Sequence, residues 1–144
     1  MDIRLATSDR DIERAADLLR QLRTHLDRAT LIERIRTQQR DGYQLALLAP
    51  ADGPAQCVAG FVITTKLAWG RALYVDDLVT DAATRSSGAG RRMLDWLKAY
   101  ARAQACGELH LDSGVQRFEA HRFYLREGFR IASHHFALTL DAPP

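Results

Sequence analysis

A short run of small residues, RSSGAG at residues 85–90, joins an apolar run that ends in LYVDDLVT to an amphipathic run that begins RRMLDWLKAYARAQ. A strand that passes through small residues into a helix leaves several backbone N–H groups unpaired at the positive end of the helix dipole. This geometry binds phosphate, because the two glycines let a diphosphate approach the backbone closely. The serines add hydroxyl groups and the arginine adds charge. On glycine count alone, an ordinary helix start packed with small residues is the better interpretation.

The elements that position this loop follow from the spacing of apolar residues. Helical spacing indicates four helices: one that carries Ile12 to Leu26 and others at residues 29–40, 88–106 and 117–129. Runs of alternating or β-branched residues indicate six strands, which we expect at residues 3–6, 41–50, 56–68, 71–80, 108–113 and 130–140. Gly107 and Gly128 stand where helix-ending residues belong.

This order, β-α-α-β-β-β-α-β-α-β, predicts one α/β (α+β) domain over residues 1–144. Strands follow one another first and then alternate with helices. We therefore expect a mixed, mostly antiparallel central sheet of six to seven strands, flanked by about four helices.

Composition excludes several classes of function. The chain has 144 residues, is 47% hydrophobic, and carries 20 basic against 18 acidic residues without a long basic block, so nothing indicates nucleic-acid binding. We expect no membrane segment and a cytoplasmic location, because MDIRLATSDRD is charged from its start and no run approaches the ~18 apolar residues of a membrane span. Cys57 and Cys106 stand alone, which indicates buried free thiols and no metal site.

Two motifs in register carry a resemblance to the GNAT family of N-acetyltransferases. RSSGAG resembles the family's R/Q-x-x-G-x-G/A signature between a strand and an amphipathic helix. AHRFYLREGF at residues 120–129 resembles its A-x-x-F-Y-x-x-x-G-F helix, and the order of elements agrees from about residue 3 to residue 139. The resemblance implies the GNAT fold, with a parallel strand pair that splays apart at the cofactor site, and acetyl-CoA as co-substrate.

The resemblance also implies how acetyl-CoA binds. Its pyrophosphate contacts the loop and helix start, here Arg85, Ser86, Ser87, Gly88, Ala89 and Gly90. Its pantetheine arm pairs with the strand edge that the splay exposes, here Leu78, Val79 and Thr80, where a strand N–H also holds the developing oxyanion. Arg117 replaces an asparagine that is common in the family, and we expect it to meet a CoA phosphate.

Tyr124 occupies the position of the tyrosine that protonates the departing CoA thiolate in many family members. A phenol is protonated at neutral pH, so the role is chemically sound. The alternative is a core aromatic beside Phe123.

Asp76 and Asp77 are the candidates that assist an amine acceptor, which must lose a proton before it attacks. LYVDDLVT resembles the E-D-L/F-F-V strand of family members that act on small amines, and this match places Asp76 where a glutamate works through water. Adjacent strand residues face opposite ways, so only one of the two faces the acceptor directly, and pairing with arginines is an equal alternative for Asp77. Further candidates for the acceptor pocket are Trp69, Tyr74 and Asp112. His121, His134 and His135 are also chemically plausible bases, but they rank below Asp76 as candidates because a lone histidine is more often a structural residue.

These residues predict an N-acetyltransferase that moves acetyl from acetyl-CoA to a primary amine by direct attack in a ternary complex. A small cationic amine is the favoured acceptor, with a protein amino group or an amino sugar next. The alternative is a non-enzymatic acyl-CoA-binding or regulatory module on the same fold. A homodimer is compatible with the resemblance, although no sequence feature tests it.

Overall fold

The computed structural model describes residues 1–141, and the chain divides into two compact units, the first ending at Leu111 and the second beginning at Asp112. The first unit contains β1 (Ile3–Leu5), α1 (Asp9–Leu19), α2 (Arg28–Arg40), β2 (Gln44–Leu48), β3 (Cys57–Lys66), β4 (Gly70–Thr80), a 3-10 turn (Ala82–Thr84), α3 (Ala89–Ala103) and β5 (Glu108–Leu111). The second unit contains α4 (Phe118–Arg126).

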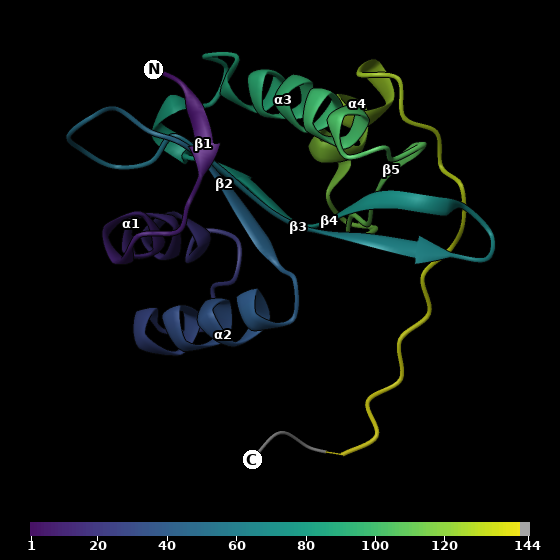
Figure 1. Ribbon diagram of the computed structural model, residues 1–144, viewed down its shortest axis with the longest axis horizontal. Helices are drawn as coiled ribbons and strands as arrows, with labels where there is room; N and C mark the ends of the chain where they lie inside the picture. Colours follow the sequence, from purple (N-terminus) through teal and green to yellow (C-terminus); the bar gives the residue numbers. More distant parts are fainter. Residues whose placement is uncertain (142–144) are drawn as a thin grey trace. The chain divides into compact units, whose positions relative to one another are not determined.

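A five-stranded mixed sheet in the order β1-β2-β3-β4-β5 forms the centre of the first unit. The first three pairings are antiparallel, and β5 pairs with β4 in parallel. Helices α1 and α2 lie on one face of this sheet and α3 on the other (Figure 1). The predicted class of fold is confirmed, whereas the predicted count of six to seven strands is wrong.

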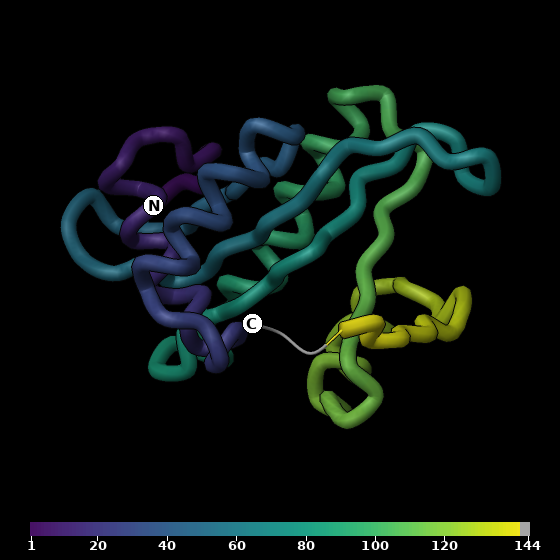
Figure 2. Tube along the Cα trace, turned by 90° about the horizontal axis from the view of Figure 1, so that it is seen from below, coloured from purple at the N-terminus to yellow at the C-terminus, as the bar shows by residue number. Residues whose placement is uncertain are grey.

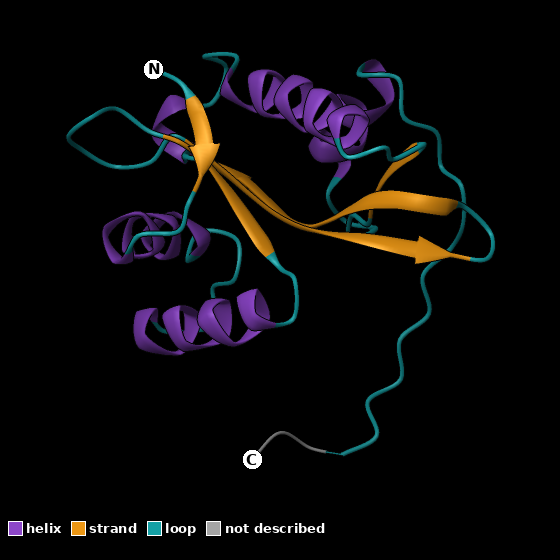
Figure 3. Ribbon diagram, in the orientation of Figure 1, coloured by secondary structure: helices purple, strands orange, loops and turns teal. Residues whose placement is uncertain are grey.

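The missing strand is the one expected at residues 130–140. Its side chains alternate as a strand requires, but the described residues after α4, up to residue 141, contain no strand and run as a loop (Figure 3). A segment with alternating apolar and polar side chains forms a strand only where a neighbouring strand supplies backbone hydrogen bonds. In the described chain the sheet ends at β5.

Apolar side chains fill both faces of the sheet. Beneath α1 and α2, residues such as Ile12, Leu19, Ile35, Leu47 and Val58 form one buried cluster. On the α3 side, the fully buried side chains include Phe61, Leu73, Met93, Leu94 and Leu97. Helices α1, α2 and α3 therefore each bury one apolar stripe against the sheet, as their spacing predicts.

Two helices are shorter than their apolar patterns. Helix α1 ends at Leu19, and the predicted helical positions Leu22 and Leu26 pack against the same core from the turn that follows. Helix α3 ends at Ala103, where Ala105 rather than Gly107 takes the left-handed conformation, with φ of +61°. Gly128, with φ of +96°, follows α4 as predicted.

The two cysteines are free thiols. Cys57 is buried and Cys106 is partly buried, and burial raises the pKa of the Cys57 thiol to about 11.

Strands β3 and β4 form a long hairpin that runs side by side to its turn (Figure 2). Strand β5 pairs with only the first part of β4, from Ala72 to Val75. Beyond this point β4 continues through residues 76–80 along β3 alone. The first unit therefore contains one strand edge that opens where the parallel pair ends.

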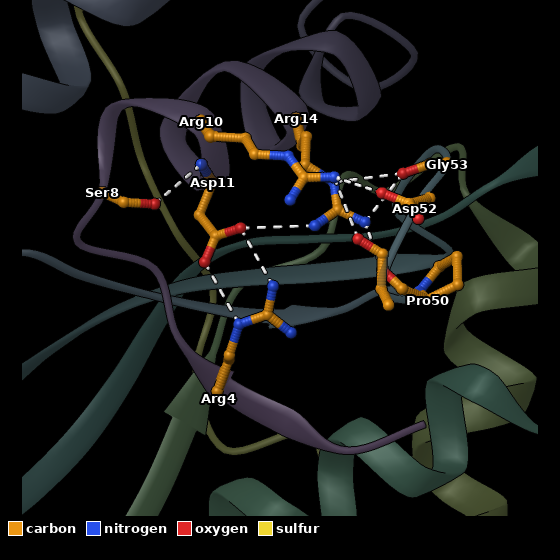
Figure 4. Close-up of polar contacts among 9 residues, drawn as sticks. Arg4, Ser8, Arg10, Asp11, Arg14, Pro50, Asp52 and Gly53 are labelled. Carbon is orange, nitrogen blue, oxygen red and sulfur yellow. Dashed lines mark hydrogen bonds and ion pairs between the residues drawn. The ribbon is translucent and has the colours of Figure 1, made fainter.

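The amino end of α1 is tied to the β2–β3 loop by a charged network (Figure 4). Arg14, with 9% of its side chain exposed, donates to the Pro50 carbonyl at 2.6 Å and the Gly53 carbonyl at 2.7 Å. Its other terminal nitrogen lies 3.3 Å from the Asp11 carboxylate, which also accepts two hydrogen bonds from Arg4. The guanidinium thus satisfies two loop carbonyls as well as a carboxylate.

Replacing Arg14 tests this network. We expect Arg14→Ala to lower the free energy of unfolding by about 2–4 kcal/mol, because it leaves two loop carbonyls without their donor and removes one of the two arginines that pair with the buried Asp11 carboxylate. Arg10→Ala is the matched control, since Arg10 is 62% exposed and pairs with Asp52, which is 97% exposed. The control should cost less than about 1 kcal/mol. Equal losses in urea unfolding of the two variants would contradict this assignment.

Candidate functional site

The site begins at a β-bulge in β4. Gly60 of β3 pairs with Asp77, but the next residue, Phe61, pairs with Val75, so Asp76 is the extra residue of the bulge. A bulge breaks the alternation of side chains along a strand and redirects its backbone groups. The two adjacent aspartates therefore do not follow the simple rule that neighbours face opposite ways.

Asp77 is held inside the protein. Arg23, in the turn after α1, donates through Nε to Asp77 Oδ1 at 2.9 Å, and its Nη2 lies 2.8 Å from the same oxygen. Tyr43 donates its hydroxyl to Asp77 Oδ2 at 2.7 Å. Only 16% of the Asp77 side chain is exposed. Of the two interpretations that the sequence left open, pairing with an arginine is the one that the structure contains.

Arg23 also fixes the backbone of the bulge. Its Nη2 donates to the Asp76 carbonyl at 2.9 Å, so a single guanidinium binds both the Asp77 carboxylate and the preceding peptide. The Asp76 side chain itself is exposed. The arrangement leaves one aspartate in an internal network and presents the other to solvent.

Tyr43 reaches Asp77 by crossing Gly60. A Cβ built on Gly60 would lie 2.8 Å from Tyr43 Cε1 and still closer to the phenol carbon and oxygen. Only glycine leaves room for the ring in this position. Burial, together with the adjacent Asp77 carboxylate, raises the pKa of Tyr43 above its ordinary value, so the phenol remains a hydrogen-bond donor.

The end of β4 forms the open edge. Leu78 and Thr80 are half-buried and Val79 is buried, with 6% exposed. Thr80 directs its hydroxyl to Cys57 Sγ at 3.6 Å. This contact and the burial of Val79 hold the end of β4 in place, while the edge of the strand on the β5 side continues beyond the parallel pairing.

The RSSGAG loop follows directly. Arg85, Ser86, Ser87 and Gly88 are all exposed, and α3 begins at Ala89 with Gly88 as its cap, without a capping hydrogen bond from a side chain. Gly88 has φ of +86°, and a Cβ built there would meet no atom within 4 Å. The backbone at Gly88, directly before this 15-residue helix, is therefore open to its surroundings.

The base of the loop is anchored to the turn after α1. Gln21 donates to the Asp81 carboxylate at 2.9 Å and accepts from the Ala82 N–H at 3.0 Å. Gln21 and Arg23 belong to the same turn, which therefore contacts both the loop and the bulge. This turn couples the two ends of the open β4 edge.

Three parallel rings stand on the sheet beyond the bulge. Trp69 stacks on His110 with ring centroids 3.5 Å apart, and Tyr74 lies 6.0 Å from Trp69 and 6.3 Å from His110. Tyr74 pairs with Val62 in the register and His110 with Tyr74, which places them on the face that α1 and α2 cover. His110 Nε2 is buried and has no hydrogen-bond partner within the described residues; Glu108 Oε1 lies 3.5 Å from it.

The other predicted site residues belong to the second unit. Tyr124, on α4, is 9% exposed and has the rings of Phe123 and Phe129 at 5.5 and 5.7 Å. Arg117 is the exposed residue before α4, and its N–H donates to the Gly114 carbonyl at 3.0 Å. Oδ2 of Asp112 lies 3.5 Å from Nδ1 of His135.

Sequence reasoning missed Arg23, Tyr43, Gly60 and His110. Tyr43 and His110 carried a weak signal, because each is a polar ring in an apolar strand-like run. Nothing in one sequence links Arg23 to Asp77, since 54 positions separate them. Among residues 1–141, no group of three or more histidine, cysteine or acidic side chains is arranged to hold a metal ion, and no helix is long and apolar enough to cross a membrane.

Gly60→Ala tests the crossing of the ring over the sheet. We expect a loss of about 1–3 kcal/mol in the free energy of unfolding, because the new methyl group forces Tyr43 away from Asp77. The control is a double-mutant cycle with Tyr43→Ala, which removes the ring. Urea unfolding should show little further cost of Gly60→Ala in that background. Additive losses would refute the contact.

The pH dependence of stability tests the Tyr43 phenol. Because its folded-state pKa is raised, the folded chain keeps a proton that the unfolded chain loses above pH about 10. Its stabilising contribution is therefore complete below pH about 10 and falls above it by up to about 1.4 kcal/mol per pH unit. The difference in unfolding free energy between wild type and Tyr43→Phe should shrink above that pH. A constant difference would contradict the prediction.

Comparison with known families and proteins shows what this chain is similar to. The model of the Acetyltransferase (GNAT) family matches residues 12–129. The uncharacterized N-acetyltransferase YhdJ of Bacillus subtilis strain 168 is 34% identical over 132 residues, which is 90% of this chain and 92% of that protein. An aminoalkylphosphonate N-acetyltransferase of Salmonella typhimurium is 34% identical over 65 residues, 45% of this chain and 41% of that protein.

Solved structures agree on the fold. The aminoglycoside N-acetyltransferase AAC(6')-Iy in complex with CoA matches with a TM-score of 0.80 at 17% identity, over 98% of this chain and 95% of that chain. A transcriptional regulator from Bacillus halodurans C-125 matches with a TM-score of 0.81 at 20% identity, over 96% and 99% of the two chains. With the family model spanning most of its length, the chain belongs to the acetyltransferase (GNAT) family.

Proposed function

We propose that this protein transfers the acetyl group of acetyl-CoA to a primary amine. The observation that carries the proposal is the succession of two features along the chain: the open edge of β4, residues 76–80, and, after a short 3-10 turn, the exposed loop that leads into α3. A strand edge binds an extended amide-containing arm by backbone hydrogen bonds, and a helix start binds a diphosphate. CoA contains both groups in that order.

The loop fits the pyrophosphate by its open backbone. Gly88 has room where a side chain would stand, and the first N–H groups of a helix such as α3 have no partner within the helix itself. The hydroxyl groups and the guanidinium of Ser86, Ser87 and Arg85 add further donors. Ala89 and Gly90 complete this proposed phosphate site, and Arg117 is proposed to bind a further CoA phosphate.

The bulge is proposed to supply the oxyanion site. Leu78, Val79 and Thr80 would pair with the pantetheine arm, and an N–H at the bulge end of this edge would donate to the thioester oxygen as it gains charge. Arg23, Tyr43 and Asp77 hold that backbone in place. Asp77 therefore acts as a positioning residue in this proposal.

Asp76 and Tyr124 are proposed to move the two protons of the reaction. The exposed Asp76 carboxylate attracts a cationic amine and accepts its proton through water. The neutral amine then attacks the thioester carbon directly in a ternary complex, and the phenol of Tyr124 protonates the departing CoA thiolate.

The acceptor is proposed to be a small cationic amine. Tyr74, two residues before Asp76 on β4, stacks with Trp69, which stacks on His110, and ring faces attract positive charge, so these residues suit an organic cation. The names of the relatives support an amine acceptor, because one acts on aminoalkylphosphonates and another on aminoglycosides. Asp112 is proposed as a further residue of the acceptor pocket. The single domain and the cytoplasmic location stay predictions from the sequence.

Thiol release from acetyl-CoA tests the proposal, measured against polyamines, amino sugars, aminoalkylphosphonates and peptides. We expect acceptor-dependent release, with kcat lowered about 100-fold or more by Tyr124→Phe, because the leaving thiolate loses its acid. Asp76→Asn should raise KM chiefly for cationic acceptors and weaken the rise of rate with pH.

Matched variants control for structural damage. Tyr100→Phe removes a phenol that bonds Gln44, and Asp52→Asn removes an exposed carboxylate; both should retain wild-type rates. Acetyl-CoA binding by calorimetry without release for any acceptor would overturn the enzyme proposal and favour a non-enzymatic acyl-CoA-binding module. Release unaffected by either site variant would instead refute the two residue assignments.

A further inference from the structure

Two polar side chains of β5 lie on a part of the sheet that α1 and α2 leave uncovered. The β3–β4 hairpin extends past the ends of both helices in two perpendicular views (Figure 1, Figure 2). Glu108 and His110 are two positions apart on β5, so their side chains share a face of the strand. His110 pairs in register with Tyr74. Both polar side chains therefore lie on the same face of the sheet as the Tyr74 ring.

Trp69 reaches this face from the turn between β3 and β4. Its ring stacks on the His110 ring, with centroids 3.5 Å apart and planes 14° apart. Its centroid also lies 6.0 Å from that of Tyr74. The nitrogens of an imidazole form hydrogen bonds in the plane of the ring. Stacking therefore covers a face of the His110 ring and leaves its edge for a ligand.

The edge of the His110 ring holds a buried nitrogen that the chain does not satisfy. Nε2 is shielded from water and forms no hydrogen bond with any residue that the structure describes. Oε1 of Glu108 lies 3.5 Å from it, beyond the usual range of a hydrogen bond, and 36% of the Glu108 side chain is exposed. Because an unsatisfied buried polar atom costs folding free energy, this pair favours a ligand that bonds both atoms.

An alkylammonium group has the chemistry that these two atoms require. It carries three N–H donors, whereas a neutral imidazole nitrogen and a carboxylate oxygen both accept. One ammonium group can therefore donate to Nε2 of His110 and to Oε1 of Glu108 at once. The faces of the nearby aromatic rings attract its charge. A carboxylate ligand of the same size would be repelled by Glu108.

We propose that Glu108, His110 and Trp69 bind an ammonium group of the acceptor other than the one that is acetylated. Glu108 pairs with Ala72, four positions before Asp76 on β4, so up to about 13 Å of strand separates the two carboxylates. One ammonium group cannot reach both carboxylates, and an acceptor with two can. The selection of such acceptors rests on the amine acetylation proposed above, whereas ammonium binding at this site does not.

Tryptophan fluorescence in the absence of acetyl-CoA tests the binding of ammonium. The chain has two tryptophans, so Trp96→Phe leaves Trp69 as its only one. The emission of Trp69 should change saturably with 1-aminobutane and not with butanoate at the same ionic strength. Glu108→Gln and His110→Phe, which keeps a ring against Trp69, should each weaken the binding of 1-aminobutane about 10-fold or more. Asp95→Asn on α3 is the matched control and should leave the binding unchanged.

A second measurement does not depend on the Trp96 substitution. Calorimetry with 1-aminobutane should show weaker binding to Glu108→Gln than to the wild-type chain. Equal binding to these two proteins would overturn the proposal. The absence of a Trp69 response to 1-aminobutane, or an equal response to butanoate, would also overturn it.

Steady-state kinetics test the selection of acceptors with a matched pair, 1,6-diaminohexane and 1-aminohexane. The diamine should have the lower KM. Glu108→Gln should raise the KM of the diamine about 10-fold more than that of the monoamine, because only the diamine loses a bound ammonium group. An equal rise for both amines would overturn the selection. The absence of acetyl transfer to any amine would overturn the selection and the proposed function together, while the Trp69 response would still decide whether the site binds ammonium.

Discussion

The absence of a side chain at Gly60 is the constraint on which the candidate site depends. It lets the Tyr43 ring lie across the sheet and donate to Asp77. Asp77 in turn pairs with Arg23, which holds the peptide of the bulge residue. A Cβ at position 60 would separate the ring from the carboxylate, and the bulge would lose one of the two side chains that brace it.

The strand β4 combines two requirements that conflict in a regular sheet. Its antiparallel pairing with β3 extends to Thr80 and anchors it in the core, whereas its parallel pairing with β5 ends at Val75. The remaining edge is rigid on one side and open on the other. A rigid open edge keeps backbone donors fixed for a ligand, so no ordering of the strand is needed when the ligand binds.

Much of the fold could be predicted from the sequence, because the information is local. Apolar spacing predicted α2 closely, and the glycine and serine residues before α3 predicted an accessible helix start. Apolar spacing predicted a longer α1 than the structure has, because Leu22 and Leu26 keep helical spacing but lie in the turn that follows the helix. It also predicted a strand at residues 130–140, where the alternation is present and the partner strand is not.

The site was less predictable because its contacts are distant in sequence. Tyr43 and Asp77 are 34 positions apart, and neither residue type indicates that the other is its partner. The sequence also did not predict the bulge, because either Asp76 or Asp77 could be the regular strand residue. Only the register with Gly60 and Phe61 shows which of the two is the extra residue.

Two neighbouring aspartates thus have different physical situations, and this difference bears on how an acetyltransferase of this family divides its work. The carboxylate of Asp77 has its two oxygens bound by Tyr43 and Arg23, so both oxygens are engaged in contacts that hold the bulge. Asp76 faces solvent while its own carbonyl is held by the same arginine. In the proposed reaction, the proton acceptor must be reachable by water and by the amine, and the positioning residue must keep its contacts with the backbone support. In the proposed reaction these two roles fall on adjacent residues, because the bulge makes Asp76 an extra residue outside the regular pairing while Asp77 stays in register with Gly60.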